Sequence, residues 1–534
     1  MDYLNLPSGS EGERRGFNLF DLSRAQDLKS KKDRITYRFF EVLPGLFSWG
    51  TLAGVFILSW LAPVTVAFFI IIFALYWVLK VTYLSLHQVS SFKQMRKNLK
   101  INWLEKLSRL QIENCKLKIE NWSDIYHLVI LPTYKEGPEI IRTSLESLIN
   151  SDYPKKNLMV VLATEERAGK ESQETAREME KEFSGKFFQF LITVHPEKIP
   201  GEVAGKGSNV AWAVEKIREK ILDKLKILPE KIIVSNFDID TRPYPQYFSC
   251  LTYHYLTAEN PLRASYQPIP VYNNNVWQAP SFSRVIATSG TFWQMMQQAR
   301  PEQLVTYSSH AVPLKTLLEV GYPSNLVSDD SRIFWKSYLV YQGSYRVIPL
   351  HYPVSMDAVM AKNLFKTIIN QYKQQRRWAW GVENIPYLLF GFLRVPGSKK
   401  IPLSERLGHV FIILEGFWSW ATASLLIFFL GWLPLALGGE SFSVTLLAYN
   451  LPKTVAVLMT LAMVGMLVSA TISFLILPAR PKKYSKIKNL SMVFQWFLLP
   501  VTLIVFGVFP ALEAQTRLML SKPLGFWVTE KIRK

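Results

Sequence analysis

Long apolar runs at both ends of this 534-residue chain constrain its fold more than any other feature. Two of them precede a polar middle and three follow it: 44–61, 64–79, 410–433, 453–477 and 491–511. Each run approaches the roughly 20 residues that a helix needs to cross the hydrocarbon core of a bilayer. A buried globular helix can account for one such run, but five of them at the two ends predict an integral membrane protein. The first two runs meet at Pro63, which predicts a helical hairpin.

The distribution of Lys and Arg predicts how these helices are oriented, because cytoplasmic loops carry an excess of basic residues. Segment 478–489 contains five basic residues and no acid, whereas Glu440 is the only charge in 434–452. We therefore predict a multi-pass protein of the cell (inner or plasma) membrane whose polar middle is cytoplasmic. The first 43 residues show no secretory-signal pattern, which agrees with this orientation.

The basic segment after the second run, 87–123, also has an apolar periodicity. Apolar side chains recur there at helical spacing: Phe92, Met95, Leu99, Trp103, Leu107 and Leu110. The pattern is typical of a helix lying on an anionic membrane surface, and a charged helix in solvent would show it equally. The net charge of the chain, 62 − 42 = +20, is compatible with anionic lipid or a phosphorylated substrate. The chain contains no nucleic-acid-binding motif, so nucleic acid is not an expected partner.

The polar middle alternates between strand and helix patterns. Short apolar runs predict strands at 127–133, 157–163, 187–194 and 231–237. Helical patterns such as PEIIRTSLESLIN and SNVAWAVEKIREKI lie between them. This alternation predicts an α/β domain with a mainly parallel sheet. Ligands of such sheets bind beyond the carboxyl ends of the strands, so the polar residues that follow each run are candidates for a site.

The fourth predicted strand is followed by the sequence DID, Asp238 to Asp240. Two carboxylates one residue apart suit a hard divalent cation such as Mg²⁺ or Mn²⁺, whose other ligands are water and substrate phosphates. A solvated acidic turn would show the same residues. Because the two aspartates directly follow an apolar strand, a metal site and a solvated turn explain them about equally well.

Five short motifs follow one another in a characteristic order: ILPTYKEG after the first strand, DID after the fourth, VSDD at 327–330, QQRRW at 374–378 and FWVTEK at 526–531. In these motifs the chain resembles the membrane-bound family 2 glycosyltransferases, which include cellulose and hyaluronan synthases. The last motif looks like the gating loop of bacterial cellulose synthases. The resemblance covers about 125–395 and the tail. It implies a GT-A-like α/β domain between transmembrane helices, and processive, inverting transfer of sugar from a nucleotide-sugar donor, expected to be a UDP-sugar, to a polysaccharide that is exported.

The resemblance also implies which residues contact the donor: Thr133, Tyr134, Glu136, Glu165, Lys206, Asp238, Gln374, Arg377 and Lys531. This chain departs from the family pattern at two positions. Lys135 stands where asparagine is usual, and the aspartate expected after the second strand is replaced by Glu165 or Glu166. The identity of the nucleoside base therefore stays open.

For the reaction itself, the resemblance implies that Asp240, with Asp238, holds Mg²⁺ or Mn²⁺. Asp330 matches the last residue of the family's TED-type motif, the general base that takes the proton of the acceptor hydroxyl. Here that motif reads Ser328-Asp329-Asp330. The same residues would also suit the first turn of a helix as a cap.

The QQRRW motif predicts a helix with one functional face. Gln374, Arg377 and Trp378 lie at positions i, i+3 and i+4 and share that face. An amide and a guanidinium suit diphosphate oxygens, and the Trp378 indole offers a flat surface to an acceptor sugar. Arg376 projects elsewhere, and we expect it to reach lipid phosphate. An interfacial helix with snorkelling arginines is compatible with this interpretation.

The carboxyl-terminal tail raises a topological conflict. Five crossings would put the tail outside, yet residues 513–534 carry five basic and two acidic residues, which favours the cytoplasm. The gating-loop resemblance, in which Lys531 reaches the donor diphosphate, also requires a cytoplasmic tail. Because Pro500 and Pro510 interrupt 491–511, we predict that this run does not cross.

These arguments divide the chain into seven parts: a cytoplasmic segment 1–43, a transmembrane hairpin 44–86, a basic amphipathic connector 87–123, a glycosyltransferase domain 124–360, interfacial helices with QQRRW 361–403, membrane helices 404–512 and a cytoplasmic tail 513–534. Expected partners are a nucleotide-sugar donor, a polysaccharide or lipid-linked acceptor and membrane lipid. Two alternatives remain open: transfer of a single sugar to a lipid, and a non-catalytic protein that binds nucleotide sugar or exports polymer.

Overall fold

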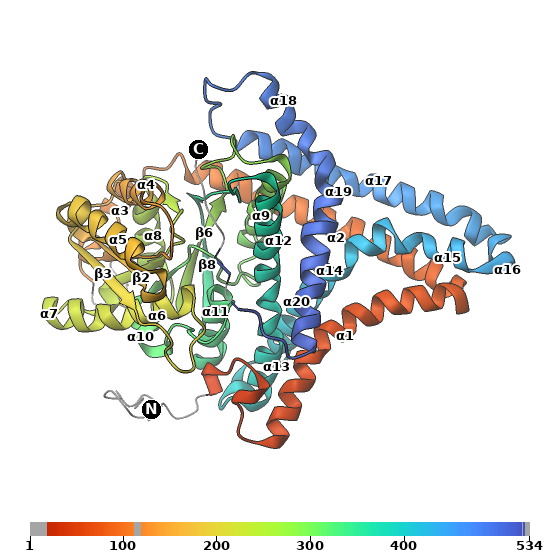
Figure 1. The fold of residues 1–534 in the computed structure, drawn as a ribbon, viewed down its shortest axis with the longest axis horizontal. Helices are drawn as coiled ribbons and strands as arrows, with labels where there is room; N and C mark the ends of the chain where they lie inside the picture. Colours follow the sequence, from red (N-terminus) through yellow and green to blue (C-terminus); the bar gives the residue numbers. More distant parts are fainter. Residues whose placement is uncertain (1–18, 112–118, 526, 529–534) are drawn as a thin grey trace.

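The chain forms a domain built around one sheet and a set of long helices that extend away from it (Figure 1). This computed structural model describes residues 19–111, 119–525 and 527–528. The strands are β1 Tyr126–Pro132, β2 Leu158–Glu165, β3 Gln189–His195, β4 Ile232–Asn236, β5 Arg242–Pro243, β6 Ala264–Val271, β7 Ala311–Pro313 and β8 Arg346–Ser355. The four predicted strands are therefore confirmed as β1 to β4.

The helices divide between the domain and the long bundle. Those around the sheet are α3 Trp103–Ser108, α4 Pro138–Ile149, α5 Lys170–Phe183, α6 Lys206–Ile217, α7 Asp223–Leu225, α8 Tyr247–Thr257, α9 Ser281–Gln298, α10 Leu314–Val320 and α11 Asp329–Val340. The others are α1 Lys31–Leu61, α2 Pro63–Asn98, α12 Leu364–Ala379, α13 Asn384–Arg394, α14 Leu403–Phe428, α15 Leu433–Leu437, α16 Gly439–Ser443, α17 Leu446–Leu475, α18 Ile487–Phe494, α19 Leu499–Thr502 and α20 Phe509–Met519.

The sheet is mixed, with the strand order β3-β2-β1-β4-β7-β6-β8-β5. Four neighbouring pairs are parallel, namely β3–β2, β2–β1, β1–β4 and β6–β8. The other three are antiparallel, namely β4–β7, β7–β6 and β8–β5. Because β2, β1 and β4 are adjacent and parallel, their carboxyl ends meet at one edge of the sheet.

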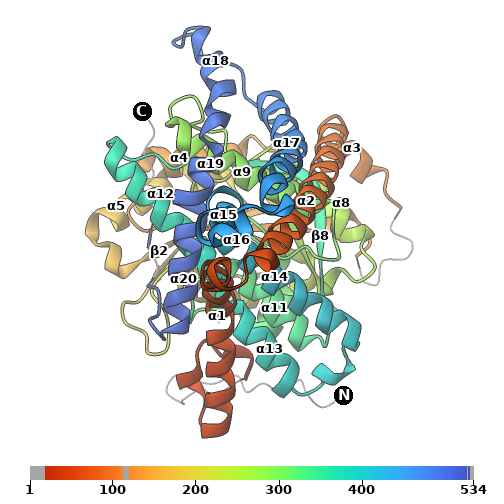
Figure 2. The same cartoon turned by 90° about the vertical axis from the view of Figure 1, so that its right-hand side faces the viewer.

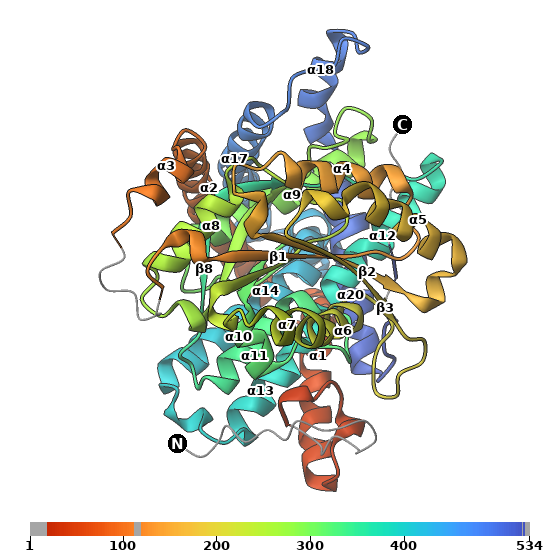
Figure 3. The same cartoon turned by 90° about the vertical axis from the view of Figure 1, so that its left-hand side faces the viewer.

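Both faces of this sheet are covered, as the continuous apolar strands require. Figure 3 shows α4 and α5 on one side of β1–β3, with α6, α7 and α10 on the other. Alternate residues of β1 point to the two sides: Val129 joins one buried apolar cluster, and Leu128 and Ile130 join the other. These two apolar clusters hold the sheet between its helices, and the carboxyl ends of β1, β2 and β4 are held in place with it.

The predicted hairpin is present, but the connector after it differs from the prediction. Helices α1 and α2 are separated by Ala62 alone, and Pro63 occupies the first turn of α2, where its missing N–H is harmless. Helix α2 continues to Asn98, well beyond the predicted end of the hairpin. Trp103 and Leu107 are buried against the sheet domain. The apolar face of the connector therefore packs on protein, so neither of the two alternatives, a helix on the membrane surface or a helix in solvent, describes it.

Among the described residues, five helical stretches are long and apolar enough to cross a membrane: Lys31–Leu61, Pro63–Asn98, Leu403–Phe428, Leu446–Leu475 and Ile487–Met519. The last stretch is not one regular helix. It consists of α18, a 3₁₀ turn at Gln495–Leu498, α19, a π-helical turn at Leu503–Val508, and α20. Pro500 and Pro510 each lie in the first turn of one of the α-helical segments.

These helices do not all run in the same direction. In Figure 1, α2 and α17 extend to the right, away from the sheet domain, whereas α19 and α20 run up and down the picture beside α12. Figure 2, which looks at the bundle from its far end, shows the same transverse course. The segment 487–519 thus lies across the base of the other long helices.

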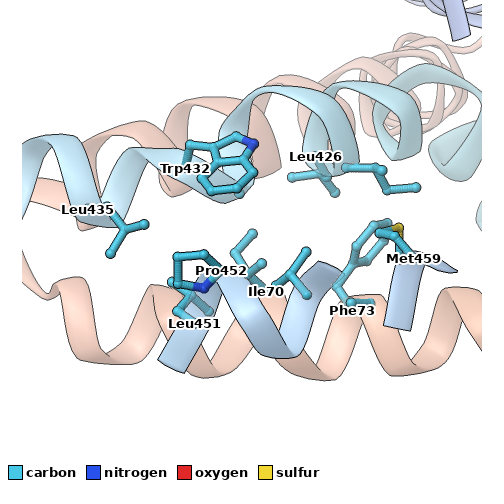
Figure 4. Close-up of a pocket in the computed structure, with 12 residues that line it drawn as sticks. Ile70, Phe73, Leu426, Trp432, Leu435, Leu451, Pro452 and Met459 are labelled. Carbon is cyan, nitrogen blue, oxygen red and sulfur yellow. The ribbon is translucent and has the colours of Figure 1, made fainter. Parts of the chain in front are cut away.

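A small apolar pocket of about 20 Å³ lies between α2, α17 and the end of α14 (Figure 4). Ile70, Phe73, Trp432 and Met459 are among its lining residues, none of which is ionisable. This pocket carries no groups for chemistry, so the candidate site lies elsewhere.

Candidate active site

The turn after β1 is organised by one carboxylate. Glu136 Oε2 accepts hydrogen bonds from Thr133 Oγ1 at 2.9 Å and from the Tyr134 amide at 2.7 Å. The Thr133 amide in turn donates to the Ala163 carbonyl of β2 at 2.8 Å. The three predicted residues of this turn therefore form one unit at the edge of the sheet, and Glu136 holds the shape of the turn.

The two glutamates after β2 have different surroundings. Glu165 is buried and forms an ion pair with Arg167, whose guanidinium carbon lies 4.6 Å from the centroid of the Tyr134 ring. Glu166 is exposed and accepts a hydrogen bond from the Glu197 amide at 2.9 Å. Of the two alternatives, only Glu165 is joined to the β1 turn.

Lys206 brings together two carboxylates that are far apart in the sequence. Its Nζ lies 2.7 Å from Asp238 Oδ1 and 2.9 Å from Asp330 Oδ1, across separations of 32 and 124 residues. Lys206 begins α6, Asp238 follows β4, and Asp330 lies in the first turn of α11. Burial opposes the charge on the ammonium, but the attraction of the two carboxylates outweighs it and raises the pKa of Lys206.

A glycine permits this close approach of α6 to the Asp330 turn. A Cβ on Gly207 would lie 2.6 Å from the Pro323 carbonyl oxygen and 3.0 Å from Asp329 Cβ. No other residue fits there without a backbone shift. The glycine that follows Lys206 in AGKGSN is therefore explained by packing.

Asp238 and Asp240 are held from several directions. Asp238 Oδ2 accepts from Ser308 Oγ at 2.7 Å, and the buried Asp240 accepts from the Asp357 amide through Oδ2 at 3.1 Å. Burial, followed by the charges of both aspartates, raises the pKa of the Tyr272 phenol. Both carboxylates are therefore close enough to Tyr272 for their charges to act on it.

This donor set fits a divalent cation. Two carboxylates facing one region are the protein ligands that Mg²⁺ typically takes, with water and phosphate in its other positions. In the described part of the chain no group of three or more His, Cys, Asp or Glu residues could hold a metal ion. Any cation here would therefore rely on Asp238 and Asp240, with substrate completing its coordination.

The adjacent aspartates of α11 face different environments. Asp329 is buried and accepts a hydrogen bond from the Tyr322 hydroxyl at 3.0 Å. Burial and the neighbouring Asp330 raise the pKa of Asp329 to about 7. The Asp330 side chain keeps 23% of its surface exposed and contacts Lys206. Asp330 is thus the carboxylate of this pair that faces the site.

Sequence patterns did not reveal His310, which lies beside Asp330. His310 Nδ1 is 2.8 Å from the Tyr307 carbonyl oxygen and 3.7 Å from Asp330 Oδ1. Because a carbonyl oxygen only accepts, Nδ1 donates to it, and burial lowers the pKa of this imidazole. Tyr272 and Ser308 were missed in the same way, since none of these residues belongs to a spaced motif.

Helix α12 brings the QQRRW residues to the same region. The Trp378 ring centroid lies 6.4 Å from that of Tyr272, and the Arg377 charge acts on both Tyr272 and Asp329. Gln374 is half-buried and accepts a hydrogen bond from Gln371 Nε2 at 3.1 Å. Arg377 and Trp378 therefore lie at the site.

The prediction for Arg376 is wrong. Its Nη1 donates to Glu513 Oε1 of α20 at 2.6 Å, and the same carboxylate accepts from Tyr372 Oη at 2.9 Å and Arg517 Nε at 2.7 Å. Arg376 binds the neighbouring helix because an acceptor of opposite charge is within reach, and no lipid phosphate is needed to explain it.

Lys531 lies outside the described residues, as do Phe526 and Thr529 of the FWVTEK motif. Within the described part of the tail, the Trp527 ring centroid is 3.5 Å from Lys373 Nζ on α12. The chain thus returns to the QQRRW helix just before Lys531.

No family model and no curated protein matches this chain. Two solved structures that match in part are a mannosyltransferase from Pyrobaculum calidifontis in complex with GDP-Man and Mn²⁺, and TarS 1-349 of S. aureus in complex with UDP-GlcNAc. The first has a TM-score of 0.39 and 16% identity, and covers 75% of this chain and 98% of that chain. The second has a TM-score of 0.34 and 11% identity, and covers 74% and 93%. Similarity at this level does not assign a function, which therefore has to be argued from the residues of the site.

Proposed function

We propose that this protein is a membrane-bound, metal-dependent, inverting glycosyltransferase with a GT-A-like domain. It transfers sugar from a nucleoside-diphosphate donor, expected to be a UDP-sugar, to a growing polysaccharide, in a processive reaction coupled to export. The observation that supports this most strongly is the convergence of Lys206, Asp238 and Asp330 at the carboxyl edge of the sheet. Separate segments of the chain supply the metal ligands, the base and the acceptor platform, as glycosyl transfer requires.

In the proposed reaction Asp330 accepts the proton of the acceptor hydroxyl while that oxygen bonds to the anomeric carbon. The bond from that carbon to the diphosphate breaks on the opposite face, so the configuration inverts. Asp238 and Asp240 would hold Mg²⁺ or Mn²⁺, which neutralises charge on the leaving diphosphate. Lys206 and Arg377 supply further positive charge beside it, and Trp378 orients the acceptor sugar.

For the membrane arrangement, we propose that α1, α2, α14 and α17 cross and that 487–519 lies along the cytoplasmic boundary. Four crossings keep both termini in the cytoplasm with the sheet domain. Exposed apolar residues along α17, such as Val457 and Leu461, suit contact with lipid. The transverse course of α19 and α20 beside α12 supports a position along this boundary (Figure 1).

Substitution of the base tests this function. The purified protein is incubated with radiolabelled UDP- and GDP-sugars and Mg²⁺ or Mn²⁺, and polymer, glycolipid and free sugar are separated. Asp330→Asn should lower transfer roughly 100-fold while donor binding persists. Asp124→Asn is the matched control, since Asp124 pairs with Lys231 before β1, at the other edge of the sheet. Turnover by Asp330→Asn within a few-fold of wild type would rule out Asp330 as the base.

Two further measurements separate the remaining parts of the proposal. Asp240→Ala, or EDTA added to the wild type, should abolish transfer, and full activity in EDTA would exclude the metal. Trp378→Ala should shorten the polymer while hydrolysis of the donor by water continues. Glycolipid as the only product of the wild type would instead indicate transfer of a single sugar.

A further inference from the structure

The turn that carries Asp330 is tied to the segment after α12 by one buried carboxylate, Glu383. Glu383 Oε1 accepts hydrogen bonds from the Ser328 amide at 3.0 Å and from Ser328 Oγ at 2.7 Å. Its other oxygen, Oε2, accepts from Trp380 Nε1 at 2.8 Å. Glu383 is 6% exposed, so these protein donors take the place of water. None of the five sequence motifs includes this residue.

On one side Glu383 fixes the beginning of α11. Ser328 is the N-cap of that helix, but its side chain accepts no hydrogen bond from the first helical turn; its hydroxyl donates to Glu383 and accepts from Asn384 Nδ2 at 3.4 Å. A cap normally satisfies the amides of the first helical turn. The position of this turn, which contains Asp329 and Asp330, therefore depends on a contact with another helix.

On the other side Glu383 belongs to the QQRRW helix. A 3₁₀ turn, Trp380–Glu383, continues α12 directly, so Glu383 follows Trp378 by five residues. Arg332 of α11 strengthens the connection, since it donates to the Glu383 carbonyl oxygen at 3.1 Å and to Asn384 Oδ1 at 2.7 Å. Glu383 and Asn384 thus join the turn that contains Asp330 to the end of the helix that contains Arg377.

We propose that Glu383 is a positioning residue that aligns the Asp330 carboxylate with Arg377 and Trp378. This role deepens the proposed function and rests on it. Glu383 acts through the Asp330 base, so the loss of Glu383 should slow the transfer step and leave donor binding unchanged. A carboxylate suits this position, because a carboxylate only accepts hydrogen bonds and three donors point at this one.

Glutamine at position 383 has nearly the same size but replaces one acceptor oxygen with a donor. That amide would face either the Ser328 donors or the Trp380 indole N–H, and one contact would be lost. A small displacement of a catalytic group lowers rates roughly 10- to 100-fold. We expect a fall of this size in kcat for Glu383→Gln, with the donor KM within a few-fold of wild type.

The test measures single-turnover sugar transfer in wild type and Glu383→Gln, each with Asp330 intact and with Asp330→Asn. A positioning role predicts a large effect of Glu383→Gln with Asp330 present and none in the Asp330→Asn background. Glu319→Gln is the matched control, since Glu319 accepts a hydrogen bond from Tyr341 Oη at 2.6 Å on another helix. If Glu383→Gln does not fold, as judged by gel filtration, Ser328→Ala removes the hydroxyl contact and takes its place.

Three outcomes would overturn the role in different ways. Equal losses in both backgrounds would show that Glu383 acts independently of Asp330. Wild-type kinetics for Glu383→Gln would show that the contact has no catalytic effect, with the proposed function intact. A wild-type protein that consumes no sugar donor would remove the proposed function itself, and this role with it.

Discussion

The most apolar windows of helix α17 and of segment 487–519 have nearly the same mean hydropathy, yet the two stretches occupy different places in the molecule. Helix α17 is an unbroken helix of 30 residues, and only 6% of its most apolar window is buried. In 487–519 the buried share is 33%, and the helix changes type several times along its length. Apolar composition makes both segments able to enter a membrane, but it does not say how either lies there.

Polar side chains account for the difference. Gln515 is 1% exposed, and it joins α20 to two other helices: Oε1 accepts from Ser48 Oγ of α1 at 2.6 Å, and Nε2 donates to the Phe417 carbonyl of α14 at 2.9 Å. Glu513, two residues earlier, binds α12. A segment with such partners packs along the protein, because unpaired polar groups in hydrocarbon would be costly.

The largest expected effect is in the accessibility of the two ends of 487–519. Single cysteines are placed at Glu440, Lys483 and Lys522 in a background without Cys115 and Cys250. If 487–519 does not cross, as proposed, an impermeant maleimide should label Glu440→Cys in intact cells and the other two only after lysis. Labelling of Lys522→Cys but not Lys483→Cys in intact cells would show that the segment crosses and that the comparison with α17 is wrong.

Loss of the α12–α20 contact should have the next largest effect. Glu513→Ala removes the acceptor for Arg376, Tyr372 and Arg517. Because the Arg376 and Glu513 side chains keep 19% and 27% of their surface exposed, we expect a loss of about 2–3 kcal/mol, below the range for fully buried pairs. The melting temperature in detergent and the rate of sugar transfer should both fall. An unchanged melting temperature would mean that α20 is held to α12 by apolar contacts alone.

A smaller effect is expected at Gln515. Gln515→Leu keeps the size of the side chain but leaves the buried Ser48 hydroxyl without this partner, at a cost of about 1–2 kcal/mol. The neighbouring Thr516→Val is the control, because the Thr516 hydroxyl accepts a hydrogen bond from Trp49 Nε1 at an exposed site. Equal shifts in melting temperature for both variants would contradict a special role for Gln515.

The smallest effect is expected on the outer surface of α17. Leu461 is 54% exposed, so Leu461→Ala should change the free energy of unfolding by no more than about 0.5 kcal/mol. One turn further along the helix, a Cβ at Gly465 would lie 2.3 Å from Val81 Cγ1 of α2, so Gly465→Val should destabilise the protein clearly. A large loss for Leu461→Ala would indicate that another protein, rather than lipid, covers this face.

Local patterns predicted much of the sheet domain correctly and failed where a distant partner intervened. The boundaries of β1 and β4 were predicted to within one residue, because a buried parallel strand is apolar along its whole length. The expectation for Arg376 failed, since Glu513 lies 137 residues away in the sequence. The connector failed for the same reason: its apolar stripe was real, but periodicity does not say whether lipid or protein covers it.

The sequence by itself determined the apolar runs, the first four strands and the motif residues that follow them, since these depend on neighbours within a few positions. Only the tertiary structure decided that Lys206 lies between Asp238 and Asp330, that Asp330 rather than Asp329 faces the site, and that Glu165 rather than Glu166 joins the β1 turn. Adjacent residues of the same type carry the same local signal. Their difference arises from burial and from partners that folding brings from elsewhere in the chain.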